Sequence, residues 1–208
     1  MTAPHLVGVD VGIGDELDLE PVIDVVAHRL EGLGVGGDMR ITTHAVVTTT
    51  GARGAIAISL PQAVTSAVEL DELVAVLSTP FGSGAHVHAA RGPGVWSERG
   101  GAAGPADLIE GARAACRALR EGRQGRSVRY AGGAGLVGDV TIAQLSLVAP
   151  VVVIGGVEEP CPSAIVSTSD FVRPRLMMGD WVIHVQSAAD GRFVPFETPT
   201  PKRCCQDK

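Results

Sequence analysis

Residues 39–60, MRITTHAVVTTTGARGAIAISL, decide the fold class of this chain. Residues 39–50 are rich in β-branched side chains, which favour strands, and residues 55–60 form an apolar run. Gly51 to Gly54 separate the two stretches and have the glycine content of a tight turn. The segment therefore predicts a β-hairpin with a four-residue turn.

Three main helices are predicted outside this hairpin. Residues 20–33 carry Pro at the first helical position and apolar residues at three- and four-residue spacing. Ser66 and Glu69 have the spacing of a capping box, ahead of a helix that ends near Pro80. Residues 105–120 form an amphipathic helix in which Cys116 faces inward, so we expect Cys116 to be a core residue.

The remaining periodic segments are predicted strands. Residues 150–156 are apolar on both faces, which is typical of a central strand covered on both sides. The last two segments should pair as a C-terminal β-hairpin. Together the segments predict an α/β or α+β fold, with about three main helices on a mixed sheet of six or more strands. The predicted strands beyond the first hairpin are residues 5–11, 85–90, 127–131, 150–156, 163–169, 180–186 and 192–198.

Length favours one domain over residues 1–197, because 208 residues lie within the range of a single core. The one candidate seam is the stretch 91–104, whose glycines and proline predict a surface loop. Residues 198–208 are predicted to be a flexible tail.

Composition excludes several classes of partner. A net charge of −6 without a basic stripe argues against nucleic acid. No apolar run reaches the roughly 18 residues of a membrane span, and the N-terminus does not have the order of a secretion signal. The four cysteines, at 116, 161, 204 and 205, have no C-x-x-C spacing, so we expect reduced thiols and a soluble, cytoplasmic protein. Aromatic residues make up only 3% of the chain, and small apolar faces favour further burial in a homo-oligomer.

His86 and His88 alternate on one predicted strand, so both imidazoles should point to the same face. One of them could act as a general acid or base, because an imidazole titrates near neutral pH. Alternatively the pair could bind a metal together with Glu98, with His184 or His44 as another source of the third ligand. A polar strand face that meets water is the competing interpretation.

Glu158 and Cys161 belong to the segment EEPCP, which follows the predicted central strand. Residues just beyond the carboxyl ends of such strands are where α/β sheets usually bind ligands. Paired carboxylates can shift each other's pKa, and a thiolate with a cationic partner is a nucleophile. The alternative is a loop stiffened by two prolines, with solvated glutamates.

Gly133, Gly135 and Gly138 form a G-x-G-x-x-G pattern after a predicted strand, with Glu158 twenty residues further on. That order resembles a dinucleotide-binding turn, in which glycines approach a pyrophosphate. Glycine makes up 27 of the 208 residues, however, and Asp139 would put a negative charge beside the phosphate. A plain turn between two strands is the competing interpretation.

We therefore expect an enzyme that acts on a small polar metabolite by general acid/base chemistry, of the lyase, isomerase or hydrolase type and without a large cofactor. Its predicted catalytic residues are His86, His88, Glu158 and Cys161. Two alternatives stay open. One is a non-catalytic homo-oligomeric assembly or ligand-binding subunit, and the other is a nucleotide- or metal-binding enzyme that uses the glycine pattern or the histidine pair.

Overall fold

The computed structural model divides the chain into two units. The first comprises Met1–Ala131 with Leu176–Asp180, and the second comprises Gly132–Arg175 with Trp181–Lys208. The stretch 91–104 lies inside the first unit. The residues that the structure describes are 4–35, 39–61, 70–80, 92–156 and 160–199.

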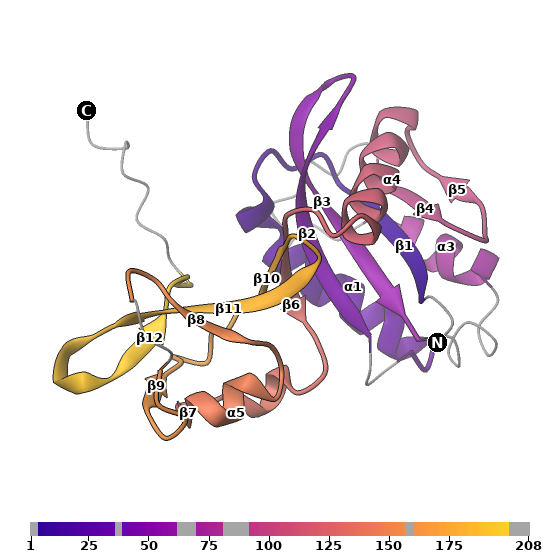
Figure 1. The fold of residues 1–208 in the computed structure, drawn as a ribbon. Helices are drawn as coiled ribbons and strands as arrows, with labels where there is room; N and C mark the ends of the chain where they lie inside the picture. Colours follow the sequence, from indigo (N-terminus) through magenta and orange to yellow (C-terminus); the bar gives the residue numbers. More distant parts are fainter. Residues whose placement is uncertain (1–3, 36–38, 62–69, 81–91, 157–159, 200–208) are drawn as a thin grey trace. The chain divides into compact units, whose positions relative to one another are not determined.

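Seven strands accompany the three longest described helices in the first unit (Figure 1). The four central strands follow the order β4-β1-β3-β2, and all neighbours among them are antiparallel. Strand β6 pairs with the outer edge of β2, and β10 lies next to β6. The strands are β1 (His5–Asp10), β2 (Arg40–Thr48), β3 (Gly51–Leu60), β4 (Gly94–Ser97), β5 (Ala102–Ala103), β6 (Gly125–Arg129) and β10 (Arg175–Met177).

Helix α1 (Glu20–Gly32) lies between β1 and β2 in the chain, and helix α3 (Leu70–Ser78) lies between β3 and β4. In the sheet, one other strand separates the two strands of each pair. Each β-α-β unit is thus split, because a strand of the other unit lies between its two strands. Two such units in succession form the ferredoxin-like arrangement. The short helix η1 (Glu16–Leu19) precedes α1, and its first turn is capped by Asp15, whose carboxylate accepts the Leu17 N–H at 2.9 Å.

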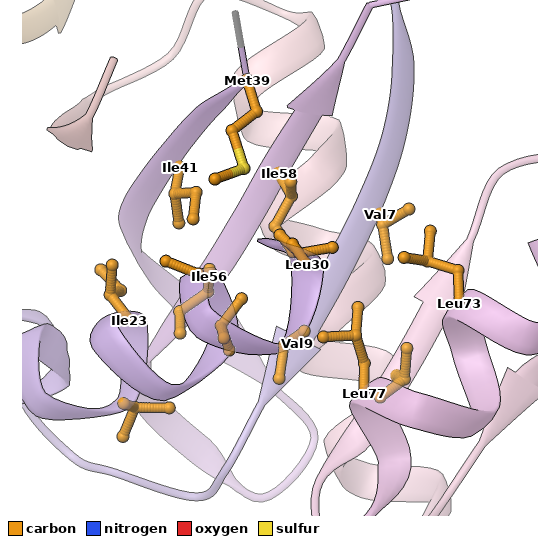
Figure 2. Packing of buried hydrophobic residues seen from close by; sticks show 14 of the residues in the cluster. Val7, Val9, Ile23, Leu30, Met39, Ile41, Ile56, Ile58, Leu73 and Leu77 are labelled. Atoms are coloured by element: carbon orange, nitrogen blue, oxygen red, sulfur yellow. The ribbon is translucent and has the colours of Figure 1, made fainter. Parts of the chain in front are cut away.

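The face of this sheet that meets α1 and α3 is a core of branched aliphatic side chains (Figure 2). Alternate residues of β1 and β3 point into it, as the two-residue period of a strand requires. Figure 2 shows Val7, Val9, Ile56 and Ile58 from the sheet against Leu30, Leu73 and Leu77 from the helices, and all of these are fully buried.

The opposite face meets helix α4 (Ala106–Arg120), which packs unusually close. A Cβ added to Gly8 would lie 2.1 Å from the Ala112 carbonyl oxygen, so only glycine fits there. Alanine supplies several of the surrounding side chains, namely Ala55, Ala57 and Ala115. Cys116 is buried in the same cluster, which confirms it as a core residue, and burial raises the pKa of its thiol to about 12.

The second unit is built from short strands around a parallel pair. Strand β11 pairs antiparallel with β12, which confirms the predicted C-terminal hairpin, and it pairs in parallel with β8. A capping box between Thr141 and Gln144 begins the five-residue helix α5. The elements are β7 (Asp139–Thr141), α5 (Ile142–Ser146), β8 (Val151–Val153), β9 (Ile165–Ser167), β11 (Asp180–Ser187) and β12 (Phe193–Pro195).

The fold-class prediction is confirmed: the sheet is mixed, the strands exceed six, and three described helices have seven or more residues. Helices α1 and α4 lie where the sequence predicted them. The first hairpin is confirmed too, although its turn is at Thr49–Thr50, because Gly51 to Gly54 already belong to β3.

Two local predictions are wrong. The stretch 91–104 is not all loop, since Gly94–Ser97 form β4, which pairs with β1 and carries the buried Val95. Its glycine lets α4 approach: a Cβ at Gly94 would lie 2.3 Å from the Leu108 backbone. Strand β8 is not central and doubly covered, because among the described strands it pairs only with β11, and Val152 is 44% exposed.

Several predicted features lie outside the described residues, namely the strand at 85–90, the capping box at Ser66 and Glu69, and residues 200–208 of the predicted tail. None of the helices within the described ranges has the length and apolar character needed to cross a bilayer.

Candidate functional site

Three of the four predicted catalytic residues, His86, His88 and Glu158, lie outside the described residues. Their convergence therefore stays a prediction. Cys161 is described and belongs to the second unit, where it is an exposed free thiol. The Ser163 hydroxyl, 3.2 Å from the Cys161 sulfur, lowers the pKa of that thiol by hydrogen bonding. Among the described residues, no cation or imidazole interacts with Cys161.

Glu98, the predicted third metal ligand, forms an ion pair with Arg120, which holds the pKa of the carboxyl below its ordinary value. His44 is buried between β2 and β6. Its Nδ1 donates to the Gln124 carbonyl at 3.0 Å and its Nε2 lies 2.9 Å from the Thr42 hydroxyl oxygen, so both nitrogens have a polar neighbour. Within the described ranges, no three His, Cys, Asp or Glu side chains gather closely enough to hold a metal ion.

The G-x-G-x-x-G segment forms a turn that leads into a strand. Gly133 and Gly135 lie in a single 3₁₀ turn, and β7 begins directly after Gly138. The Gly138 N–H, which would face a phosphate, donates to the Asp170 carboxylate at 2.8 Å. The next helix, α5, begins only at Ile142, so no helix N-terminus follows the last glycine. Nucleotide binding here stays a prediction, and the local geometry is that of a turn between strands.

The structure points instead to Asp10, which the sequence did not single out. Asp10 is the last residue of β1 and points toward α4, opposite Gly94 in the β1–β4 register. The loop after it begins V-G-I-G, and the Gly12 N–H turns back to donate to Asp10 Oδ1 at 2.7 Å. Gly12 has a left-handed φ of +76° in this turn, a conformation that glycine adopts without strain.

The second carboxylate oxygen of Asp10 is buried without a hydrogen bond from any described group. The backbone of Gly111 on α4 closes over it so tightly that a Cβ at Gly111 would lie 1.8 Å from Asp10 Oδ2. Among the described residues, Arg53 forms an ion pair with this oxygen, and its Nη1 lies 3.6 Å away. An orphaned buried oxygen of this kind is costly when charged, so it favours the protonated acid.

Burial is accordingly the main cause of a large pKa shift. It raises the pKa of Asp10 from 3.8 to about 6, against the opposing effects of the Gly12 N–H and the Arg53 guanidinium. The carboxylate of Asp107 adds a small further increase. Asp10 therefore exchanges protons close to neutral pH, as a catalytic acid or base must.

Arg53 connects this buried oxygen to the surface. Asp10 is fully buried, Arg53 is 10% exposed at its side chain, and Asp107 in the first turn of α4 is 25% exposed. Arg53 Nη2 donates to the hydroxyls of Thr48 and Thr50, which fixes the guanidinium. Its Nη1 lies 3.6 Å from Asp10 and 3.8 Å from Asp107, and both distances exceed hydrogen-bond length.

Comparison with protein-family models, with curated proteins and with solved structures finds no match. The candidate site is therefore the Asp10 cluster, which we define as Asp10, Gly12, Arg53, Asp107 and Gly111. A sequence signal for it does exist. An aspartate that ends an apolar strand and precedes G-x-G is typical of a carboxylate held at a strand end beside a tight turn.

Proposed function

We propose that this chain is an enzyme that moves a proton on a small polar metabolite, with Asp10 as the general acid and base. The observation that carries the proposal is the buried Asp10 oxygen, which no described group hydrogen-bonds, next to a guanidinium that reaches the surface. With a pKa of about 6, about a tenth of Asp10 is protonated at pH 7. Both protonation states are then available for turnover.

Arg53 is the residue that we expect to bind a negatively charged or carbonyl oxygen of the substrate. Because both of its carboxylate contacts are longer than hydrogen bonds, a substrate carbonyl or carboxylate oxygen can bind Nη1 in place of Asp107. Charge that develops on that oxygen when Asp10 removes an adjacent C–H proton would be stabilised by the guanidinium. The proton then returns from Asp10 to the product, as in isomerases and lyases.

His86 and His88 stay candidates for a second acid or base. His88 precedes Gly94 by six residues, and Gly94 pairs with Asp10, so the length of the chain permits either imidazole to reach the Asp10 cluster. Glu158 and Cys161 stay candidate catalytic residues on the basis of the sequence alone.

Proton exchange tests the proposal without knowledge of the complete reaction. The protein is incubated in D₂O with a panel of small hydroxy, keto and amino acids, and loss of each α-proton signal is followed by NMR. We expect the α-proton of at least one compound to exchange with solvent. The exchange rate should rise with pH, with an apparent pKa near 6. Asp10→Asn should slow it at least about 100-fold.

The matched control is Asp15→Asn, which changes an exposed carboxylate outside the cluster and keeps an oxygen to cap η1. This variant should catalyse proton exchange at the native rate. Equal rates in Asp10→Asn and the native protein, or no exchange across the panel, would refute the assignment.

A second candidate function is a non-catalytic assembly subunit. Exposed apolar side chains of the second unit favour it, since Val137, Leu147, Val152, Ile154 and Phe196 are all exposed large hydrophobics. A protein that stays monomeric at every concentration in sedimentation would exclude it.

A further inference from the structure

Among the described strands, β8 of the second unit has a neighbour on one edge only, and we call the other side its open edge. On its inner side, the Ile183 N–H donates to the Pro150 carbonyl and the Ile154 N–H donates to the Val185 carbonyl, both at 2.8 Å. Alternate residues of a parallel ladder face the partner strand, so the main-chain groups of Val151 and Val153 point away from β11. The Val153 carbonyl accepts the Gly156 N–H at 3.2 Å and keeps a second lone pair for another donor. No other described strand pairs with that side.

The side chains along this edge are apolar and uncharged. Val152 and Ile154 are 44% and 43% exposed, and residues 149–156 (APVVVIGG) contain no ionisable group. Proteins usually protect an open edge with a charged side chain, a bulge or a proline within the strand. The three residues of β8 contain no charged side chain and no proline.

We propose that the β8 edge binds the β8 edge of a second copy of this chain, antiparallel and about a two-fold axis at Val152. A strand related to itself by a two-fold axis is always self-complementary, so an identical chain fits without a special register. Val151 then pairs with Val153 of the other copy, and Val152 faces its own equivalent.

Charge also favours a second copy at this edge over most other places on the surface. The chain carries a net charge of −6, so two copies repel each other unless they meet where charge is absent. Residues 149–156 provide such a place. Because β8 has only three residues, we expect a dimer that dissociates on dilution.

Disulfide trapping tests this geometry. In an antiparallel pair without mutual hydrogen bonds, the facing Cα atoms are about 4.5 Å apart, which a disulfide can span. Val152→Cys is made in a background in which Cys161, Cys204 and Cys205 are Ser, and Cys116 stays buried. We expect a covalent dimer under mild oxidation, formed at least about tenfold faster than with Leu147→Cys.

Leu147 is the matched control because it is 87% exposed but lies outside β8. The second measurement is sedimentation of Val153→Pro, which removes an outward N–H and keeps the bonds to β11. The native chain should gain mass with concentration, and Val153→Pro should stay monomeric while its circular dichroism is unchanged.

Equal trapping of the two cysteine variants, or a native chain that is monomeric throughout, would overturn the proposal. Dimerisation of Val153→Pro at the native concentration would place the interface elsewhere and overturn it too. The inference does not depend on Asp10. Asp10→Asn should dimerise like the native chain, so failure of one proposal is distinguishable from failure of the other.

Discussion

The two faces of the first unit's sheet are covered by helices in different ways. On the α1/α3 face, branched aliphatic side chains such as Ile56 and Ile58 fill the space between helix and sheet. On the α4 face, glycine and alanine let the helix backbone approach, and the side chains near the ends of the strands are polar and ionisable. The first face depends on side-chain volume, and the second depends on close backbone contact.

This difference explains where the candidate chemistry lies. A thick aliphatic layer can bury a carboxyl only at a high cost in free energy. Close contact with α4 instead buries Asp10 against backbone, while Arg53 leaves a polar route to solvent. We infer that the α1/α3 face mainly stabilises the unit and that the α4 face carries its chemistry.

The largest predicted effect is on the aliphatic face. Ile56→Ala should lower the free energy of unfolding by about 4 kcal/mol, because it leaves a cavity among fully buried side chains. Urea unfolding followed by Trp96 fluorescence in a Trp181→Phe background reports on the first unit alone. Val47→Ala, at an exposed site on β2 of the same unit, is the control, and an equal effect of the two changes would contradict the aliphatic core.

Gly8→Ala tests the close contact on the other face. Its Cβ would lie 2.1 Å from the Ala112 carbonyl, so α4 must move, and we expect a loss of about 3 kcal/mol in the same unfolding measurement. Gly32→Ala, at the end of α1 with no atom within 4 Å of the added Cβ, should cost nothing. A tolerated Gly8→Ala would mean that the helix does not pack this closely.

Asp10→Asn should change how stability depends on pH. Burial raises the folded pKa of Asp10 to about 6, above the value in the unfolded chain. The folded state therefore binds more protons between about pH 4 and 6, and Asp10 lowers the free energy of unfolding by up to about 3 kcal/mol as pH rises through that window.

The variant does not titrate at this position. Its free energy of unfolding, relative to the native protein, should rise by a similar amount between pH 4 and pH 7. Parallel pH profiles of the two proteins in denaturant titrations would argue against a buried, shifted carboxyl.

The smallest predicted effect concerns the exposed contact between the hairpin and α4. The Thr49 hydroxyl donates to Glu110 at 2.7 Å, and its N–H lies 3.3 Å from both carboxylate oxygens. Glu110→Gln should lower the free energy of unfolding by no more than about 1 kcal/mol, because solvent competes for these bonds. A loss as large as that of Gly8→Ala would show that this contact, and not the glycine, holds α4 to the sheet.

The spacing of apolar residues and the residues typical of turns predicted much of the fold. The stripe of α1, the amphipathic α4 and the alternation of β11 have strong local patterns, and each was found where it was predicted. Strand β4 has no such pattern, because its glycine is required by contact with α4, which local sequence does not reveal. The apolar run of β8 suggested burial on both sides, but hydropathy does not say how many neighbours a strand has.

The candidate site was less predictable. The sequence predicts a site at His86, His88, Glu158 and Cys161 because imidazoles, carboxylates and thiols are reactive groups. The sequence places Asp10 at a strand end ahead of G-x-G but does not show that its carboxyl is buried. Its shifted pKa arises from burial, to which the Gly111 backbone, distant in the sequence, contributes through the packing of α4 on β1.

Titration of the Asp10 carboxyl carbon by NMR is the most direct test of the central claim. We predict a midpoint near pH 6, since the carboxyl is buried against α4 and one of its oxygens has no hydrogen bond from the described part of the chain. A midpoint at or below about 4, the value of a solvated aspartate, would contradict the account.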